Sequence, residues 1–261
     1  MLLGQPDTVL ASVTAAAEAA AASTAYLTND LDFDTSPDLD PSADLSSLAV
    51  AEDPIFLEKL ARRIDKTTIT PLHDPRPGKK CLVLDIDYTI FDLGTPGETM
   101  TEKARPYLHE FMTACYAFYD IVIWSATSMK WVVGKMTELG CMNHSEYKLT
   151  CLMDGMSMVT VTTNEYGTFN CKPLQVLWAK YPEVYTPENT VMLDDLRRNF
   201  VANPRQGLRI RMFKHAKSRG LDDDELLRLK VGAEGGLLRA VAIIDNVTSQ
   251  HVHMHYYCCC Y

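Results

Sequence analysis

The chain has 261 residues, of which 47% are hydrophobic, and it carries a formal net charge of −9. This length and composition are sufficient for one sizeable α/β domain with a buried core, plus additional segments. The acidic balance gives no support to nucleic-acid binding, which needs a basic face, and no apolar run reaches the ~18 residues that favour a membrane span.

The negative charge is concentrated at the N-terminus. No Lys or Arg precedes Lys59, whereas eleven of the 34 acidic residues do, which leaves 23 acidic against 25 basic residues in the rest of the chain. Between Thr28 and Asp53, acidic residues, Ser and Pro alternate with short apolar residues without a sustained period. We therefore predict that residues 1–53 form a disordered arm, first Ala-rich and then acidic.

The first predicted element after the arm is a helix that begins at Pro54. Phe56, Leu60 and Ile64 recur four residues apart in "PIFLEKLARRIDK", which is typical of an amphipathic helix, and Pro suits its first turn. A continuous apolar run at 81–84 then predicts a buried strand.

The middle of the chain predicts alternating helices and strands. We expect a helix over 106–119, a buried strand in "DIVIWSA" (120–126) and a further helix capped by Ser128. The segment "LTCLMDGMSMVTVTT" (149–163) is interpreted as a β-hairpin that turns near Asp154 and Gly155. A helix from Pro173, a buried strand at 190–195 and a short edge strand in "GLRIRMF" (207–213) complete the pattern.

Strands that alternate with helices predict an α/β fold with an open, mostly parallel sheet flanked by helices. Such sheets bind ligands at the carboxyl ends of their strands. The segments between the predicted elements leave space for a small β-hairpin insertion and no large cap domain.

The pattern D-x-D-x-[ST] occurs three times, and its context distinguishes the three copies. Asp85, Asp87 and Thr89 directly follow the buried strand at 81–84, so a rigid element orients these side chains. The copies that begin at Asp32 and Asp38 lie in the acidic arm and follow no such strand. Only the first copy is therefore predicted to form a functional site.

Other candidate site residues also follow predicted strands or precede a helix. Ser125 follows the second strand, Asp194 and Asp195 end the third, and Lys172 stands directly before the helix at Pro173. Together these residues supply carboxylates for one Mg²⁺ ion, a carboxylate nucleophile, a hydroxyl and an ammonium group. Thr127 is an alternative source of the hydroxyl.

These motifs resemble the haloacid-dehalogenase superfamily and, within it, the carboxy-terminal-domain phosphatases of FCP/SCP type. The similarity lies in "LDIDYT", "WSAT", "CKPL" and "LDDL", in that order, and extends to "RPGKKCLVLDIDYTIFD", "RPYLHEF" and "NPRQGLRIR". The last three segments are similar to the group members that carry a ubiquitin-like domain. The resemblance implies a Rossmann-like haloacid-dehalogenase fold over residues 54–230.

For such a phosphatase, each candidate residue has an expected role. Asp85 is expected to attack phosphorus and form an aspartyl-phosphate, while Asp87 protonates the leaving oxygen and later activates water. Mg²⁺ is expected on the Asp85 carboxylate, the Asp87 backbone carbonyl and Asp194, with Asp195 orienting a metal-bound water. Ser125 and Lys172 are expected to bind the other phosphoryl oxygens.

The resemblance implies hydrolysis of phosphoserine or phosphothreonine in a phosphoprotein, a nuclear location and the proteasome regulatory particle as a partner. We expect no ubiquitin-like domain before the arm, so the chain would lack the domain that docks such a phosphatase to the proteasome. We also expect a divergent tail at 231–261. Five cysteines in apolar contexts without a C-x-x-C pair fit a reducing compartment. Two alternatives remain: a small-molecule phosphatase with the same acids, and a truncated, non-catalytic interaction protein.

Overall fold

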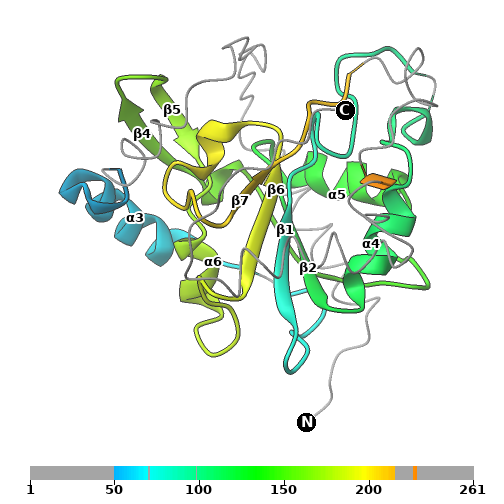
Figure 1. Cartoon of the computed structure of the whole chain (residues 1–261), viewed down its shortest axis with the longest axis horizontal. Coiled ribbons are helices and arrows are strands. Elements are labelled where there is room, and N and C mark those ends of the chain that lie inside the picture. Colours follow the sequence, from blue (N-terminus) through cyan, green and yellow to red (C-terminus); the bar gives the residue numbers. More distant parts are fainter. Residues whose placement is uncertain (1–49, 70, 98, 215–225, 228–261) are drawn as a thin grey trace, which may run out of the picture.

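The computed structural model describes residues 50–69, 71–97, 99–214 and 226–227. A five-stranded sheet in the order β3-β2-β1-β6-β7 forms its centre (Figure 1), and each neighbouring pair of strands in it is parallel. The strands are β1 (Lys80–Leu84), β2 (Tyr119–Trp124), β3 (Leu149–Met153), β6 (Thr190–Asp194) and β7 (Gly207–Arg209). The predicted open parallel sheet is confirmed.

The central strand β1 is buried on both faces, which explains its unbroken apolar sequence. Leu82 and Leu84 belong to the core on one side of the sheet, and Cys81 and Val83 to the core on the other. Successive side chains of a strand point to opposite faces, so a strand covered on both sides must be apolar at every position. The same reasoning applies to β2, in which every residue is buried.

Helices cover both faces of the sheet (Figure 1). α4 (Leu108–Tyr116) and α5 (Met129–Glu138) contribute to one core, and α3 (Pro54–Lys66) and α6 (Gln175–Lys180) to the other. The predicted start of α3 is confirmed, since the Asp53 carboxylate accepts a hydrogen bond from the Ile55 N–H at 2.9 Å. Phe56 and Leu60 are the residues that α3 buries.

The small antiparallel hairpin exists, but its predicted position was wrong. β4 (Val159–Thr163) pairs with β5 (Gly167–Cys171), and the turn lies between them rather than at Asp154 and Gly155. The segment 149–153 is instead β3, the outer parallel strand of the main sheet. Gly155–Ser157 is a short 3₁₀ turn that connects the two sheets.

Two helix boundaries also differ from the predictions. α4 is shorter than the predicted 106–119, because Tyr107 before it has a left-handed backbone (φ 63°) and Tyr119 already belongs to β2. Ser128 occupies the N-cap position of α5, but its side chain makes no capping hydrogen bond. Asp154 fulfils that role, accepting from the Met129 N–H at 3.1 Å. The predicted tail and the arm up to residue 49 lie outside the described residues. The last residues of the predicted arm are described: residues 50–52 are helical, and Asp53 caps α3. No described helix is long and apolar enough for a membrane span.

Candidate active site

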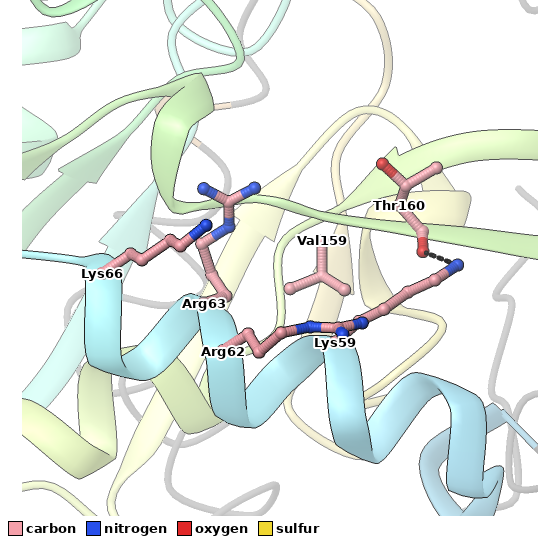
Figure 2. Close-up of a pocket in the computed structure, with 6 residues that line it drawn as sticks. All are labelled: Lys59, Arg62, Arg63, Lys66, Val159 and Thr160. Carbon is pink, nitrogen blue, oxygen red and sulfur yellow. Dashed lines mark hydrogen bonds between the residues drawn. The ribbon is translucent and has the colours of Figure 1, made fainter.

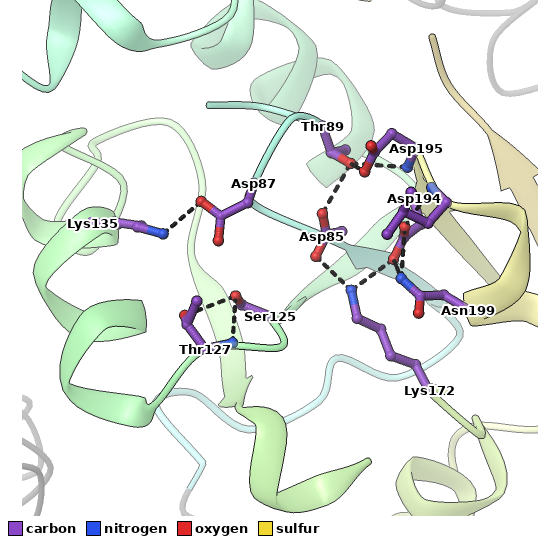
Figure 3. A network of polar contacts seen from close by, with 11 residues as sticks. Asp85, Asp87, Thr89, Ser125, Thr127, Lys135, Lys172, Asp194, Asp195 and Asn199 are labelled. Atoms are coloured by element: carbon purple, nitrogen blue, oxygen red, sulfur yellow. Dashed lines mark hydrogen bonds and ion pairs between the residues drawn. The ribbon is translucent and has the colours of Figure 1, made fainter. Parts of the chain in front are cut away.

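Three of the predicted carboxylates converge with Lys172 at the carboxyl end of the sheet (Figure 3). Asp85 directly follows β1, and Asp194 is the last residue of the adjacent strand β6. The Lys172 ammonium donates to Asp85 Oδ1 at 2.5 Å and to Asp194 Oδ2 at 2.6 Å. All three side chains are buried, so this is a triad of ionisable groups held out of water.

Lys172 reaches the cluster from the hairpin, not from the main sheet. It directly follows β5, and its backbone N–H donates to the Asn199 carbonyl at 3.3 Å. Asn199 also donates its side-chain N–H groups to both oxygens of Asp194, at 2.9 and 2.8 Å. The hairpin and the 3₁₀ turn at Arg197–Phe200 thus fix the ammonium and the carboxylate that faces it.

Thr89, the last residue of the motif, links the acids through its hydroxyl. That group donates to Asp85 Oδ2 at 3.1 Å or to Asp195 Oδ1 at 3.3 Å, and it accepts from the Asp195 N–H at 3.1 Å. The turn that carries it contains Tyr88 in a left-handed conformation (φ 61°). A backbone of that kind costs energy in a residue other than Gly and is typical of functional sites.

Arg105 supports the same turn. This residue is buried, and its guanidinium donates to the Thr89 carbonyl at 2.9 Å. Its backbone N–H also donates to the Ile90 carbonyl at 2.9 Å. Arg105 therefore fixes the backbone of the turn that carries Thr89.

Burial and mutual repulsion shift the pKa values of the acids. Desolvation raises the pKa of Asp85 to about 7; Lys172 opposes this shift, and Asp194 and Asp87 add to it. Desolvation, Asp194 and Asp85 raise the pKa of Asp195 to about 8. Burial lowers the pKa of Lys172, but Asp194 and Asp85 outweigh it and raise that pKa above its ordinary value, so the ammonium stays charged.

The donor set fits a magnesium ion. Asp85, Asp194 and Asp195 each offer a carboxylate oxygen, and these atoms lie within 4.8 Å of one another. Within the described part of the chain, the buried Asp195 Oδ2 has no hydrogen-bond partner. Buried polar atoms without a partner are rare, and Mg²⁺ prefers oxygen ligands. A bound cation would satisfy that oxygen and offset the repulsion that raises both pKa values.

Asp87, the second acid of the motif, lies apart from this cluster. Figure 3 shows its carboxylate directed toward Lys135 of α5, with an ion pair of 2.5 Å between Lys135 Nζ and Asp87 Oδ1. Lys135 is almost fully buried, and 16% of the Asp87 side chain is exposed. The side chain of Asp87 is therefore accessible at the edge of the site, where a reacting group could approach it.

The predicted hydroxyl group is in place at the end of β2. The Ser125 hydroxyl lies 2.9 Å from that of Thr127 and accepts from the Thr127 N–H at 3.2 Å, so both alternatives lie in one loop. Gly155 packs against this loop so closely that a Cβ atom would lie 2.3 Å from the Ala126 carbonyl oxygen. The 3₁₀ turn after β3 thus fixes the position of the loop.

Sequence reasoning missed Lys135 and Asn199. Lys135 lies one helical turn after Trp131 on α5, and nothing in its local sequence distinguishes it from a solvated lysine. Asn199 follows the acidic motif in "LDDLRRNF" and had no signal other than its proximity to that motif. Lys135 contacts an acid 48 residues away, and Asn199 contacts the acid at the end of β6 from the following 3₁₀ turn. Both contacts depend on how the chain folds.

Comparisons with known proteins show which phosphatases the chain resembles. The family of NLI interacting factor-like phosphatases matches residues 80–246. A ubiquitin-like domain-containing CTD phosphatase of Arabidopsis thaliana is 51% identical over 194 residues, which are 74% of this chain and 56% of the relative. The ubiquitin-like domain-containing CTD phosphatase 1 of Xenopus tropicalis is 48% identical over 202 residues, covering 77% and 62%.

The phosphatase of the same name from Homo sapiens is 50% identical over 173 residues, which are 66% of this chain and 54% of the relative. The chain thus spans between 54% and 62% of the length of these relatives. The similarity of its motifs to the carboxy-terminal-domain phosphatases is confirmed. The chain belongs to the NLI interacting factor-like phosphatase family.

Proposed function

We propose that the chain is a Mg²⁺-dependent protein phosphatase that hydrolyses phosphoserine or phosphothreonine through an aspartyl-phosphate. The observation that carries this proposal is the Lys172 ammonium between Asp85 and Asp194, with Asp195 beside them at the carboxyl edge of the sheet. Positive charge fixed beside a buried carboxylate is suited to a reaction that brings a phosphate dianion to that carboxylate.

In the first step, Asp85 attacks phosphorus, and the bond between phosphorus and the serine or threonine oxygen breaks. Asp87 gives a proton to the leaving oxygen. In the second step, Asp87 takes a proton from water as this water attacks phosphorus, and the bond between Asp85 and phosphorus breaks, which releases phosphate. Asp87 pairs with Lys135 in the structure, and the proton transfer would replace this contact by one with the leaving oxygen.

The remaining residues position these two acids and the phosphoryl group. Asp85, Asp194 and Asp195 would hold Mg²⁺, together with the backbone carbonyl of Asp87. When bound, the metal supplies positive charge that neutralises the phosphoryl oxygens. Lys172 adds its own charge beside Asp85, and the hydroxyls of Ser125 and Thr127 offer hydrogen bonds to the oxygens that remain.

The small hairpin favours a protein substrate. β4 and β5 each have five residues and form a two-stranded sheet, which is far smaller than a domain that could enclose a small metabolite. An open site of this kind can accept a phosphorylated residue in a larger chain. The names of the relatives support a CTD-type phosphoprotein as the substrate. The resemblance of the motifs extends the proposal to a nuclear location and to the proteasome regulatory particle.

The proposal is tested by hydrolysis of a chromogenic aryl phosphate by the purified chain as Mg²⁺ is titrated. We expect turnover that depends on Mg²⁺, is abolished by EDTA and is absent in a folded Asp85→Asn variant. Phosphoserine peptides and sugar phosphates are then compared at equal concentration. Faster turnover of the sugar phosphates would identify a small-molecule phosphatase, and no turnover of any ester would support an interaction protein.

A further inference from the structure

A groove lined by basic side chains lies between helix α3 and strand β4, outside the acid cluster (Figure 2). It has a volume of about 290 Å³, and its lining residues are Lys59, Arg62, Arg63, Lys66, Val159 and Thr160. Two pairs of these cations, Lys59 with Arg63 and Arg62 with Lys66, lie four residues apart along α3, so all four lie toward one side of the helix. We refer to this feature as the basic groove.

Two of the four cations bind neutral carbonyl groups, and a third pairs with an exposed acid. Lys59 donates to the Thr160 carbonyl at 3.1 Å, and Arg63 donates to the Met156 carbonyl at 2.6 Å. Arg62 pairs with Glu58 at 2.9 Å, but both side chains are more than half exposed. Exposed pairs of this kind contribute little and exchange partners easily. The groove is thus ordered, positive and open to an anionic group.

Helix stability alone does not explain this charge. Arg63 and Lys66 lie in the last turn of α3, where basic residues offset the negative end of the helix dipole. Lys59 and Arg62 lie before that turn, where the dipole effect is weak. The dipole thus accounts for two of the four cations and the pair with Glu58, one helical turn before it, for Arg62, whereas Lys59 extends the positive charge to β4 without such a role.

Contacts between successive segments connect the basic groove to the active site. Arg63 binds the carbonyl of Met156, which lies in the 3₁₀ turn Gly155–Ser157. Gly155 packs against the Ala126 carbonyl and donates its N–H to the Thr127 carbonyl at 3.0 Å. Both carbonyls belong to the loop of residues 125–127, which carries the Ser125 and Thr127 hydroxyls and which we call the hydroxyl loop. An extended peptide with its phosphate at that loop could follow this turn into the groove.

We propose that the basic groove binds an anionic segment of the phosphoprotein substrate, formed by acidic or additional phosphorylated residues in the same chain as the residue to be hydrolysed. This inference rests on the proposed function and specifies its substrate class. The proposal rests on charge complementarity and on the contacts that connect the groove to the hydroxyl loop. Binding at the groove acts through substrate affinity, with no role in the chemical step.

The acidic arm of this chain is the competing occupant. It carries acids at Asp38, Asp40 and Asp44, which lie 10 to 16 residues before Pro54, where α3 begins. The arm could therefore reach the groove from the start of α3. The contacts with the hydroxyl loop favour the substrate, because an arm that only stabilised the fold would need no such connection.

The test compares a phosphoserine peptide that carries a run of Glu residues on each side of the phosphoserine with one that carries Gln at the same positions. The full chain is assayed with Lys59, Arg62 and Lys66 changed to Gln. A matched control carries Lys79→Gln, Lys148→Gln and Arg205→Gln, which remove the same charge from loops before β1, β3 and β7, at the opposite edge of the sheet. Peptide binding to each Asp85→Asn version is followed by fluorescence anisotropy, which requires no turnover.

We expect the groove variant to raise KM and Kd for the Glu peptide about fivefold or more, with kcat unchanged and the Gln peptide unaffected. Raising the salt concentration should reduce this difference. Turnover of the aryl phosphate should be the same in the unchanged chain, the groove variant and the control, all of which keep Asp85, and its absence in all three would refute the proposed function independently of the groove. Equal losses in the groove variant and the control would refute the inference. A several-fold lower KM after Asp38, Asp40 and Asp44 are changed to Asn would identify the arm as the occupant.

Discussion

Replacing Lys172 by Met should separate the two contributions of this residue, to stability and to the reaction. The ammonium is fully buried and lies 2.5 Å from Asp85 and 2.6 Å from Asp194. Met keeps the length of the side chain but leaves two buried carboxylates without their cation. Removing one partner of a buried ion pair costs about 3–5 kcal/mol, a large part of the 5–15 kcal/mol that is typical of a whole domain.

We therefore expect the free energy of unfolding of metal-free Lys172→Met, measured in urea at about pH 8, to fall by about 3–5 kcal/mol. A second change, Asp85→Asn, removes one of the unpaired carboxylates. The double variant should therefore recover part of that loss, although Asp85→Asn alone destabilises the chain. Mg²⁺ should stabilise Lys172→Met more than the unchanged chain, because a cation then replaces the missing charge.

Turnover gives the second measurement. Losing one group that stabilises charge in the transition state typically lowers kcat about 10²- to 10³-fold, and we expect that loss in Lys172→Met saturated with Mg²⁺. A Lys172→Met variant as stable as the unchanged chain, with no coupling to Asp85→Asn, would refute the ion triad. Unchanged kcat in that variant would show that the ammonium does not act on the phosphoryl group.

Three other perturbations test separate parts of the site. Asp87→Asn should slow hydrolysis of a phosphoserine peptide more than that of an aryl phosphate, whose leaving group needs no proton; equal losses would exclude Asp87 as the general acid. Gly155→Ala should lower kcat and stability by pushing the hydroxyl loop, whereas Gly134→Ala, whose added Cβ meets no atom within 4 Å, should leave kcat unchanged. A similar loss of kcat in both variants would contradict the role of Gly155 in positioning the hydroxyl loop. Burial raises the pKa of Asp85 to about 7 and of Asp195 to about 8 from 3.8, so the metal-free folded chain binds more protons than the unfolded chain above pH 3.8. Its free energy of unfolding should therefore fall as pH rises from about 4 to about 8, and excess Mg²⁺ should oppose the fall; urea unfolding that shows a rise in EDTA would contradict the pKa shifts.

The sheet and the acid cluster could be predicted because their signals are local. β1 and β6 are unbroken apolar runs that end in acids, and parallel strands that are buried on both faces require such sequences. Carboxyl ends of parallel strands lie at one edge, so Asp85 and Asp194 were expected together without knowledge of the register. The register places Leu84 beside Leu193, the residues that precede these acids.

The hairpin error has a physical cause. The segment 149–163 contains two strand-like runs separated by Asp154 and Gly155, which is a common turn signal. Burial distinguishes the runs: every residue of β3 is buried, whereas β4 alternates buried and exposed positions. A strand covered on both faces belongs to the parallel sheet, and an alternating strand suits a hairpin with one solvated face. The turn signal was given more weight than this difference.

Lys135, Asn199 and Arg105 could not be assigned from the sequence, because their partners come from the tertiary fold. Lys135 pairs with Asp87 across 48 residues of chain, and Arg105 binds the Thr89 carbonyl across 16 residues. An isolated Lys or Arg in a helix or before one is more often solvated than buried. Only the packing of α5 and of the segment before α4 against the motif reveals these contacts.

The central claim is that Asp85 becomes phosphorylated during turnover, and trapping the phosphorylated enzyme tests it most directly. The chain is mixed with a radiolabelled phosphoserine peptide and Mg²⁺, quenched in acid within the first turnover and digested for peptide mapping. We predict label on the peptide that contains Asp85, released by hydroxylamine as an acyl phosphate requires, and no label in a folded Asp85→Asn variant. Normal turnover by that variant, or label on another residue, would contradict the account.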